Sequence, residues 1–370
     1  MGGAGAFGSR LADGLAATVD CEVVIGGRGT SNATRTRDDL RWRHPRAQVD
    51  IARIDAARAG AGDIRCLRPD VVVDAAGPYR PGTYGLARAC IEAGVSYVDI
   101  ADGRAFVTGF PAALDEAARS AGVVAVTGAS STPALSNAAL DEVVRGWRRV
   151  DRIEVAISPG NRAPRGLSVF QSILAYAGKP VHVLRAGGWA YAPGWGLTLR
   201  RPMEGLGTRR LSLCETPDLD IMPARYPDAG EALFRAGLEL GFLHLGLTAA
   251  TLPVRMGMLD SLVPLASTFR LVAALFERMG TDRGGMEVVA EGLDATGAHV
   301  RGTWSLVAEA GDGPHVPTLP ALALVRAILS GSPPAPGARA CVGILGLAAI
   351  EAEMRRLRIT TRIGTVPLPR

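Results

Sequence analysis

The chain has 370 residues, 48% of them hydrophobic, and carries a formal net charge of +5. This length provides for two domains with sizeable cores, and the hydrophobic content excludes a largely disordered protein. The positive charge comes almost entirely from scattered arginines, because Lys179 is the only lysine. Without a basic stripe or interleaved aromatic residues, the sequence predicts no nucleic-acid-binding surface.

The five cysteines are widely spaced and include no Cys-x-x-Cys pair. They predict neither a disulfide framework nor a zinc site, and no other metal site is expected. The N-terminus lacks the basic region and apolar core that are typical of a secretory signal. We therefore expect a cytoplasmic protein.

The first predicted element is a glycine-rich turn that opens a helix. Gly3, Gly5 and Gly8 fit the G-x-G-x-x-G pattern, with Ala6 and Phe7 between the last two glycines. In dinucleotide-binding folds such glycines allow a tight turn, a close approach of the backbone to a pyrophosphate, and close packing of helix on strand. The pattern alone is weak evidence here, because 46 of the 370 residues are glycine. We nevertheless predict that these five residues bind a dinucleotide.

The strand that normally precedes such a turn is missing. In dinucleotide-binding folds this strand lies centrally in the sheet, whereas here only Met1 and Gly2 come before the motif. Our hypothesis is that the true start lies upstream of Met1, and the alternative is that the first strand has been lost. An in-frame stop codon directly before the Met1 codon would contradict the first interpretation.

A short apolar run after the first helix predicts the next strand, and it ends just before Arg28. A dinucleotide fold reads the adenosine ribose at this point, and an NAD-preferring site places Asp or Glu there. Here Arg28 takes that place, followed by Thr30 and Ser31, with Arg35 and Arg37 further on. A guanidinium suits a 2′-phosphate, so the sequence favours NADP over NAD. The alternative is that Arg28 is one solvated arginine among many.

A third strand is predicted before Asp55, which either caps a helix or contacts the adenine. The apolar run at residues 71–76 is typical of a buried parallel strand. It continues into a loop at the carboxyl end of that strand, where open α/β sheets bind their ligands. Ala76, Gly77 and Pro78 are therefore predicted coenzyme contacts.

Short apolar strands and helices of roughly ten residues continue to alternate as far as residue 126. This alternation predicts a Rossmann-type, doubly wound parallel sheet. Asp99 and Asp102 lie at the end of one strand, where they either orient a substrate or cap the residues that follow. Ser130 lies in a Gly-Ala-Ser-Ser-Thr-Pro stretch that opens a helix. This stretch is either a helix cap or a small anion-binding cradle.

From about residue 150 the pattern changes to alternating strands and hairpins, which predicts a second, mixed α+β domain. We expect paired strands at residues 181–184 with 189–191, and at 287–292 with 300–307. The predicted domains are a dinucleotide-binding domain at 1–133, a substrate and dimerisation domain at 134–315, and C-terminal helices at 316–370 that pack back on the first domain.

The second domain contains an apolar insert at 236–278, with long leucine-rich helices predicted at 236–252 and 256–275. Both helices contain charged residues, whereas a membrane span requires about 20 residues nearly free of charge. We therefore predict a buried helical hairpin or a dimer interface, and expect a homodimer. Interfacial membrane contact and an apolar substrate tunnel are the alternatives.

Several stretches together resemble the saccharopine dehydrogenase-like oxidoreductase family. They are residues 3–8, 70–79, 97–103, 128–133, 158–162 and 311–314. The resemblance is strongest between residues 70 and 140. It implies an NADP-binding Rossmann domain, a mixed α/β substrate domain with a helical insert, and hydride transfer at the cleft between them. The substrate is not fixed by this resemblance, because such proteins act on small or lipid-like molecules with C=N, C=O or activated C=C bonds.

Hydride transfer depends mainly on positioning, and a proton donor helps when a carbonyl or imine is reduced. His315, Tyr79 and Asp102 are the predicted catalytic residues, with His315 as the donor. For each of them a packing, capping or surface role is the alternative. Arg162 and Arg165 either bind a substrate carboxylate or are solvated. The alternative function is a non-catalytic protein that retains the fold to bind a lipid or a partner.

Overall fold

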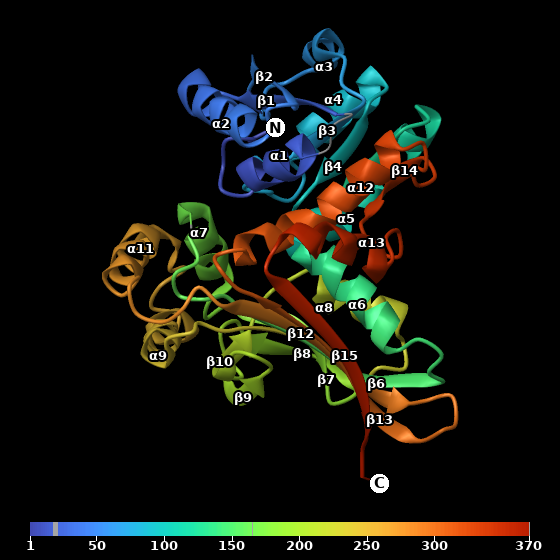
Figure 1. Cartoon of the computed structure of the whole chain (residues 1–370). Coiled ribbons are helices and arrows are strands. Elements are labelled where there is room, and N and C mark those ends of the chain that lie inside the picture. Colours follow the sequence, from blue (N-terminus) through green and yellow to red (C-terminus); the bar gives the residue numbers. More distant parts are fainter. Residues whose placement is uncertain (18–20, 165, 370) are drawn as a thin grey trace. The chain divides into compact units, whose positions relative to one another are not determined.

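The computed structural model describes residues 1–17, 21–164 and 166–369 (Figure 1). The chain divides into two compact units, each assembled from two separate stretches of sequence. Unit 1 consists of Met1–Leu135 and Pro314–Met354, and unit 2 consists of Ser136–Gly313 and Arg355–Arg370. The segment predicted to form C-terminal helices therefore contributes to both units.

Unit 1 has the predicted Rossmann-type α/β architecture, with parallel strands flanked by helices. One sheet has the strand order β14-β5-β4-β3, and β1 pairs with β2 separately; all of these pairs are parallel. The strands are β1 (Glu22–Gly27), β2 (Gln48–Arg53), β3 (Val71–Asp74), β4 (Ser96–Asp99), β5 (Val124–Thr127) and β14 (Gly337–Ala340). The main helices are α1 (Gly8–Ala16), α2 (Thr30–Arg43), α3 (Ala61–Leu67), α4 (Gly85–Ala93), α5 (Arg104–Ser120), α12 (Leu319–Leu329) and α13 (Leu347–Ala352). Short helical turns lie at η1 (Ser131–Leu135), η3 (Gly313–Thr318) and η4 (Glu353–Arg356).

Met1 and Gly2 link the two sheets of unit 1. The amide of Gly2 donates to the carbonyl of Gly26 at 2.9 Å, and the amide of Ala75 donates to the carbonyl of Met1 at 3.0 Å. Within the described residues no strand lies between β1 and β3, so these two residues make the connection there. The glycine turn consequently starts at the position between β1 and β3, as a dinucleotide-binding fold requires.

Apolar spacing explains how α1 packs. Ala12 and Ala16 lie four residues apart, on one face of the helix, and pack against Val23 and Ile25 of β1 in one buried cluster. Their small side chains let the helix lie close to the strand. This close packing fixes the start of α1, and with it the glycine turn, relative to the sheet.

Unit 2 is built on a large mixed sheet with the order β15-β13-β12-β6-β11-β10-β9, to which β7 and β8 add at β11. β6 and β11 are parallel, and the other pairs are antiparallel. The predicted hairpins are confirmed as β7 with β8 and β12 with β13. The strands are β6 (Arg149–Ser158), β7 (Pro180–Arg185), β8 (Gly188–Pro193), β9 (Leu199–Met203), β10 (Gly207–Leu213), β11 (Glu231–Ala236), β12 (Gly284–Leu293), β13 (His299–Ala308) and β15 (Ile359–Pro367).

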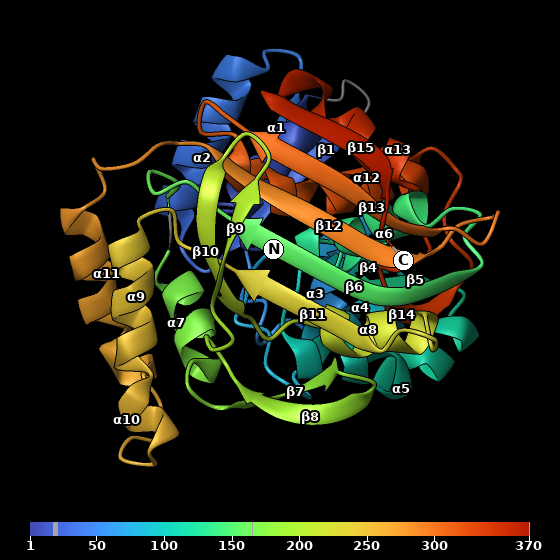
Figure 2. The ribbon, with the colours of Figure 1, turned by 90° about the horizontal axis from the view of Figure 1, so that it is seen from below.

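The helices of unit 2 form two groups. α6 (Ser136–Val143) packs on β12 and β13, and α8 (Asp218–Arg225) packs on β7 and β11. Figure 2 shows the second group beside the sheet, beyond β9 and β10. It comprises α7 (Leu167–Tyr176), α9 (Gly241–Ala250), α10 (Leu252–Arg255), η2 (Val263–Leu265) and α11 (Ala266–Leu275).

The apolar insert differs from the predicted pair of long helices. α10 ends at Arg255, and the chain is not helical again until η2, because Gly257 adopts a left-handed conformation with a φ of +71°. The hairpin is not buried in this chain, because α9 buries only His244 and Leu247, and α11 buries only Ala266. In the part of the chain that the structure describes, no helix is both long and apolar enough to cross a membrane.

Candidate functional site

Most of the predicted coenzyme contacts, and the predicted catalytic residue Asp102, lie at one edge of unit 1. Arg28 follows β1, Ala76 follows β3, Asp102 follows β4, and Ser130 follows β5. Because these strands are parallel, their carboxyl ends meet at the same edge, which is where open α/β sheets bind ligands. The structure therefore brings together loops that are up to 102 residues apart in sequence, counted from 28 to 130.

The glycine turn forms the start of this edge. The amide of Gly5 donates to the carbonyl of Gly2, and the amide of Ser9 donates to the carbonyl of Gly5, both at 2.9 Å. Gly8 is buried, and a Cβ there would overlap the Gly2 carbonyl oxygen and lie 2.8 Å from the Cα of Gly3. The third glycine of the pattern is thus required for the close approach of α1 to the chain before it.

The exposed part of the turn is suited to an anion. Gly5 and Ala6 are exposed, and Phe7 is the N-cap residue of α1. No side chain caps this helix, and its first turn contains no acidic residue. Backbone N–H groups at a helix N-terminus bind phosphate through both hydrogen bonds and the helix dipole. Gly3 packs against Ile25, since a Cβ added at Gly3 would lie 3.0 Å from the Ile25 side chain.

The residues after β1 are open to solvent. Arg28, Thr30 and Ser31 are all exposed, and α2 begins at Thr30 with Gly29 as its N-cap. The first turn of α2 has no acidic residue and no side-chain cap. A second helix N-terminus with hydroxyl groups and a guanidinium beside it therefore lies at the point that was predicted to read the ribose.

A pocket of about 550 Å³ lies next to the glycine turn. Its walls come from the turn, from α1, from α2 and from η3, and are formed by Ala4, Ser9, Arg10, Asp13, Arg35, Thr36, Asp39, Arg43 and His315. Arg43 is neutralised by Asp13 and Asp39, each at 2.5 Å. Among the described residues no ion pair involves Arg10 or Arg35, and the buried Nε of Arg10 has no acceptor. The pocket therefore presents two arginines without an acidic partner, which suits an anionic ligand.

His315, the predicted proton donor, lines this pocket together with Ala4 and Ser9 of the glycine turn. It lies in η3, where the hydroxyl of Thr318 donates to its carbonyl at 2.7 Å. Asp55 lies elsewhere, after β2, where its Oδ1 accepts a hydrogen bond from the amide of Ala57 at 3.1 Å. Asp55 therefore caps the turn at residues 56–58 and not a helix, since α3 begins at Ala61 with Gly60 as its N-cap.

Asp74 organises the loop after β3. Its Oδ1 accepts from the amide of Ala76 at 2.9 Å, and its Oδ2 accepts from the hydroxyl of Tyr97 at 3.3 Å. Burial raises the pKa of the Asp74 carboxyl above its ordinary value. Gly77 and Pro78 extend from this anchored point to the surface and are exposed.

Tyr79 is fixed beneath the same loop. Its hydroxyl donates to the backbone carbonyl of Asp74 at 2.8 Å, and its ring lies 5.4 Å from that of Phe106. Burial, followed by the neighbouring carboxyls, raises the pKa of Tyr79 well above its ordinary value. The hydroxyl proton is therefore held in a structural hydrogen bond. Asp102 lies after β4 and is exposed.

Asp99 is the residue at this edge whose role sequence reasoning missed. It is fully buried beside Asp74 in the register of β3 and β4. Its Oδ1 accepts three hydrogen bonds, from the amide of Gly128 at 2.8 Å, the amide of Ala101 at 2.9 Å and the hydroxyl of Thr127 at 2.9 Å. Burial raises the pKa of Asp99 to about 7. The position at the end of a buried strand was the available signal, but the sequence does not show which loops the carboxyl joins.

Ser130 belongs to the loop that Asp99 anchors. It is buried, and its amide donates to the carbonyl of Gly128 at 2.8 Å. The amide of Leu135 in turn donates to the Ser130 carbonyl at 3.1 Å. The loop after β5 is thus closed by a bond within it and tied to the helical turn after it.

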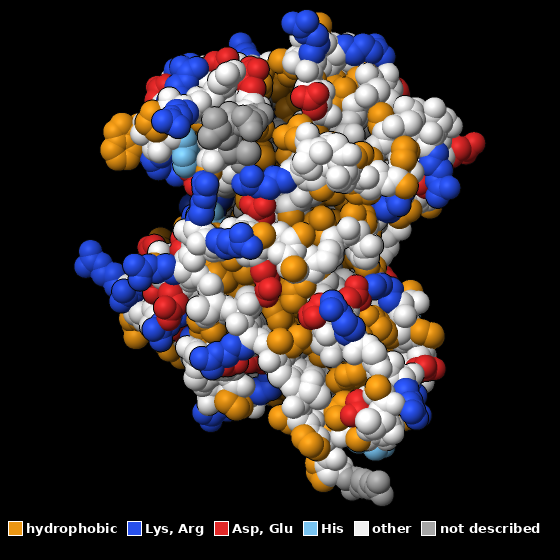
Figure 3. Space-filling model, turned by 45° about the vertical axis from the view of Figure 1, so that its right-hand side comes forward, with side chains coloured by type: hydrophobic (Ala, Val, Ile, Leu, Met, Phe, Trp, Pro, Cys, Tyr) orange, Lys and Arg blue, Asp and Glu red, His pale blue; other side chains and the backbone are white. Residues whose placement is uncertain are grey.

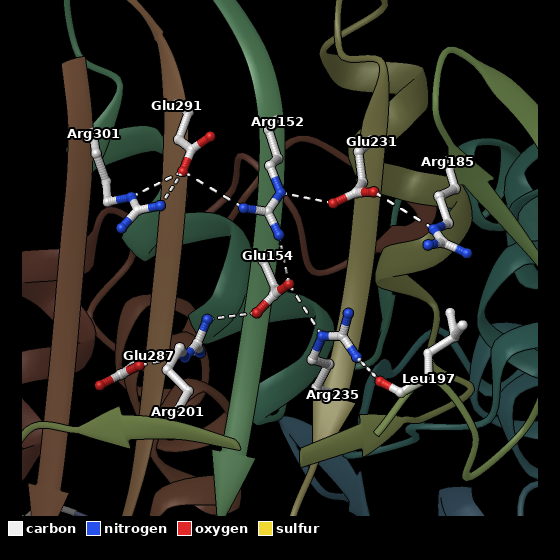
Figure 4. A network of polar contacts seen from close by, with 10 residues as sticks. All are labelled: Arg152, Glu154, Arg185, Leu197, Arg201, Glu231, Arg235, Glu287, Glu291 and Arg301. Atoms are coloured by element: carbon white, nitrogen blue, oxygen red, sulfur yellow. Dashed lines mark hydrogen bonds and ion pairs between the residues drawn. The ribbon is translucent and has the colours of Figure 1, made fainter. Parts of the chain in front are cut away.

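A second polar cluster covers one face of the unit 2 sheet (Figure 4). Its centre is Glu154, whose side chain is 2% exposed and which pairs with Arg152, Arg201 and Arg235 at 3.1, 2.5 and 3.1 Å. Further pairs extend from Arg152 to Glu231 and Glu291. Each charge in this cluster has an opposite partner, so the arrangement supports the sheet and leaves no evident site for an anion.

The predicted arginine pair in unit 2 is described only in part. Arg162 donates from Nη2 to the carbonyl of Arg278 at 3.3 Å, whereas Arg165 lies outside the described residues. On the face of the molecule shown in Figure 3, arginine side chains are interspersed with acidic ones. The positive charge on this face is therefore not gathered into one stripe.

The comparisons with known proteins agree with this architecture. Residues 1–126 match the family model described as the saccharopine dehydrogenase NADP binding domain, and no curated protein matches the chain. Apo histidine-tagged saccharopine dehydrogenase (L-Glu forming) from Saccharomyces cerevisiae is similar in structure, with a TM-score of 0.69, 13% identity and coverage of 98% of each chain. The predicted resemblance is confirmed in sequence over residues 1–126 and in fold over nearly the whole chain.

Two further structures are less similar. Amine dehydrogenase from Mycobacterium smegmatis has a TM-score of 0.46 at 13% identity, covering 90% of this chain and 91% of that one. The WlbA (WbpB) dehydrogenase from Thermus thermophilus, in complex with NAD and alpha-ketoglutarate, has a TM-score of 0.40 at 12% identity, covering 96% and 91%. Identities this low show a shared fold only, and TM-scores below 0.5 do not add to it.

Proposed function

We propose that this protein is an NADP-dependent oxidoreductase whose coenzyme binds at the carboxyl edge of unit 1. The observation that carries the proposal is the glycine turn at the start of α1, which no side chain caps, beside a pocket that contains Arg10 and Arg35, two arginines without an acidic partner among the described residues. The match of residues 1–126 to an NADP-binding domain and the fold shared with a saccharopine dehydrogenase support it.

In this proposal the backbone binds the pyrophosphate. Gly3, Ala6, Phe7 and Gly8 of the turn place their amides toward the phosphates at the N-terminus of α1, whereas the amide of Gly5 bonds to the carbonyl of Gly2 and shapes the turn. Glycine at position 5 leaves room for the pyrophosphate to approach the backbone, since only the Gly2 carbonyl oxygen lies within 4 Å of a Cβ added there.

The arginines and hydroxyls around α2 select the phosphorylated coenzyme. Arg28, Thr30 and Ser31 are exposed after β1, and Arg35 follows one turn later on α2. A 2′-phosphate adds charge that a guanidinium binds through paired hydrogen bonds, whereas a ribose hydroxyl gains little from it. The contact between Asp55 and the adenine is a weaker part of the proposal, because the Asp55 carboxyl already accepts a hydrogen bond in its own turn.

The loops after β3 and β5 form the nicotinamide half of the proposed site. Ala76, Gly77 and Pro78 line one side, and Ser130 lines the other. When bound, NADPH supplies the hydride, and the protein supplies position, exclusion of water and a proton. His315 is the proposed donor of that proton. It lines the pocket beside the glycine turn, whereas the residues of the nicotinamide half are not among those that form this pocket.

Tyr79 and Asp102 take different parts in the proposal. The Tyr79 hydroxyl is bonded to the Asp74 carbonyl, so Tyr79 positions the Gly77-Pro78 loop and is less suited to transfer a proton. Asp102 is exposed after β4, where a carboxyl can orient a substrate. The substrate carries a C=N, C=O or activated C=C bond and is small or partly apolar.

The second candidate is a non-catalytic protein that binds a lipid or a partner. The observation that favours it is the exposure of large apolar side chains on the insert, including Met258 at 71% and Leu275 at 73%. Monomeric soluble proteins rarely leave such side chains contiguous and exposed. The two candidates differ in one measurable property, which is the binding of a nicotinamide coenzyme.

Titration with NADPH and NADH, followed by the fluorescence of the reduced nicotinamide, tests the proposal. We expect NADPH to bind more tightly than NADH, and Arg28→Ala or Arg35→Ala to weaken NADPH by roughly tenfold, as loss of a charged hydrogen bond does. Arg37→Ala is the matched control on the same helix, because Arg37 already pairs with Asp38 at 2.8 Å. Equal losses for both coenzymes would contradict the role of Arg28, and failure to bind either coenzyme would favour the second candidate.

A further inference from the structure

Asp99 joins two loops of the proposed coenzyme site. Its Oδ1 accepts from the amide of Ala101, in the loop after β4, and from the amide of Gly128, in the loop after β5. The hydroxyl of Thr127 donates to the same oxygen at 2.9 Å. Three donors on one carboxyl oxygen hold the ends of β4 and β5 at a fixed separation.

The backbone reinforces this junction. The amide of Ala129 donates to the carbonyl of Asp99 at 2.8 Å, so both the side chain and the main chain of Asp99 bind the loop after β5. Gly128 turns there with a φ of +71°, and a Cβ at this position would lie 2.6 Å from the Cδ of Pro133. The loop therefore has one tight conformation, and Asp99 is its main polar anchor.

The charge of Asp99 has no cation beside it. Among the described residues none of the ion pairs includes Asp99, and its buried Oδ2 has no hydrogen-bond partner. The titratable groups that influence it are acidic or neutral, and come from β3, the loop after β3, the start of α4, β4 and the segment after β14. They are Asp74, Tyr79, Tyr84, Tyr97 and Cys341. A buried carboxylate whose only partners are neutral donors is easily protonated.

We propose that Asp99 is a positioning residue whose carboxylate holds the loop of Gly128 and Ser130 in the conformation that receives the nicotinamide half of the coenzyme. The carboxylate accepts stronger hydrogen bonds from Gly128, Ala101 and Thr127 than the neutral acid does. Protonation of Asp99 weakens these three hydrogen bonds while the side chain stays buried, so the loop is held less rigidly and coenzyme binding weakens. This inference rests on the proposed function, but the state of the loop is measurable without any coenzyme.

Two variants distinguish the ionisation of Asp99 from the hydrogen-bond geometry around it. Asp99→Asn keeps an oxygen that can accept the three hydrogen bonds and removes the ionisation. Thr127→Val removes one of the three donors and leaves the carboxyl in place, so it moves the midpoint of the Asp99 titration to higher pH. Asp294→Asn is the control, because Asp294 caps the turn between β12 and β13 in unit 2. A merely structural role of Asp99 would not move a titration midpoint.

The test follows two readouts between pH 5.5 and 8.5. The first is the amide NMR shift of Gly128 and Ala101 without coenzyme, and the second is the dissociation constant of NADPH. We expect the chemical shifts of the wild-type amides to titrate near pH 7. We also expect the wild type to bind NADPH more tightly at pH 8 than at pH 6, by a factor about fivefold larger than the same factor in Asp99→Asn, as the difference between charged and neutral hydrogen bonds predicts. The comparison with Asp99→Asn cancels the ionisation of the 2′-phosphate, which both proteins experience.

Wild-type amides that do not titrate in this range, or an Asp99→Asn protein with the wild-type pH profile, would overturn the inference. If Asp99→Asn does not fold, Thr127→Val still decides, because an unchanged midpoint in that variant contradicts the role of Asp99. If the wild type binds neither NADPH nor NADH, the proposed function fails, while the amide titration still shows whether Asp99 controls the loop.

Discussion

Both units contain a deeply buried carboxylate on a strand, Asp99 in unit 1 and Glu154 in unit 2, and the surroundings of the two differ. Glu154 on β6 is 2% exposed and lies between Arg152, Arg201 and Arg235. Asp99 on β4 is fully buried and accepts its hydrogen bonds from neutral donors. Burying an ion is costly, and the cost is offset in unit 2 by opposite charges but in unit 1 only by hydrogen bonds.

This difference corresponds to a difference in role between the two carboxylates. The arginines around Glu154 come from strands β6, β9 and β11, so the cluster binds separate parts of the sheet together. Asp99 instead binds two loops at the sheet edge where ligands bind in such folds. A buried charge without an opposite partner, such as that of Asp99, responds to pH and to a nearby ligand.

The largest effect is expected when Glu154 is removed. Glu154→Ala leaves the buried Arg235, whose side chain is 7% exposed, without its carboxylate partner. Loss of one partner from a buried ion pair costs about 3–5 kcal/mol, so the free energy of unfolding should fall by that amount. Denaturant unfolding measures it. Glu291→Ala at the edge of the same cluster should cost about 1 kcal/mol or less, because its partner Arg301 is 45% exposed. If Glu154→Ala and Glu291→Ala lower the free energy of unfolding equally, the buried centre of the cluster stabilises the protein no more than its exposed edge does.

The next effect concerns the pH dependence of stability. Burial raises the pKa of Asp99 from 3.8 to about 7, so between these values the native state binds a proton that the unfolded state has released. The free energy of unfolding should therefore fall as the pH rises from 4 to 7, by at most about 4 kcal/mol. Asp99→Asn should lack this contribution.

Denaturant midpoints at pH 4.5, 6 and 7.5 give the measurement, and the difference between wild type and Asp99→Asn cancels the contributions of the other groups. As the pH rises, the free energy of unfolding of the wild type should fall relative to that of Asp99→Asn. A constant difference across this range would show that Asp99 does not take up a proton in the native protein.

The sequence predicted the carboxyl edge of unit 1 because its signals are local. The glycine turn and the loop after β3 each lie within about ten residues of sequence, and a strand followed by a loop has one position in a parallel sheet. The Glu154 cluster could not be predicted in the same way. Its members come from residues 152 to 301, and only the strand register of unit 2 brings them together.

Long-range pairing also explains the other differences. β14 adds to the unit 1 sheet beside β5, and β15 adds to the unit 2 sheet beside β13, although both lie in a segment predicted to be helical. Short strands of this kind are stabilised by the edge they join rather than by their own sequence. The pocket beside the glycine turn was missed because its arginines come from the sides of α1 and α2.

A smaller effect is expected at the glycine turn, where no charge takes part. Gly8→Ala places a methyl group against the carbonyl of Gly2, so the turn must shift. We expect a loss of about 1–3 kcal/mol in the free energy of unfolding, as for other overpacked positions, and loss of coenzyme binding. Gly62→Ala is the control. Nothing lies within 4 Å of its added Cβ, and alanine should stabilise α3 by about 0.5–1 kcal/mol. Normal coenzyme binding by Gly8→Ala would show that the turn does not approach the phosphates.

The smallest effect on stability is expected at the exposed side chains of the insert, which are neither paired nor packed. Leu271 and Leu275 on α11 are 65% and 73% exposed, so Leu271→Ser with Leu275→Ser should change the free energy of unfolding by no more than about 0.5 kcal/mol. Leu247→Ala on neighbouring α9 should cost about 2–5 kcal/mol, because Leu247 is 7% exposed. Binding of an apolar fluorescent probe should fall in the double serine variant and stay unchanged in Leu247→Ala under native conditions. If the serine variant instead unfolds easily, the side chains are buried in the protein in solution, and a second copy or another partner covers them.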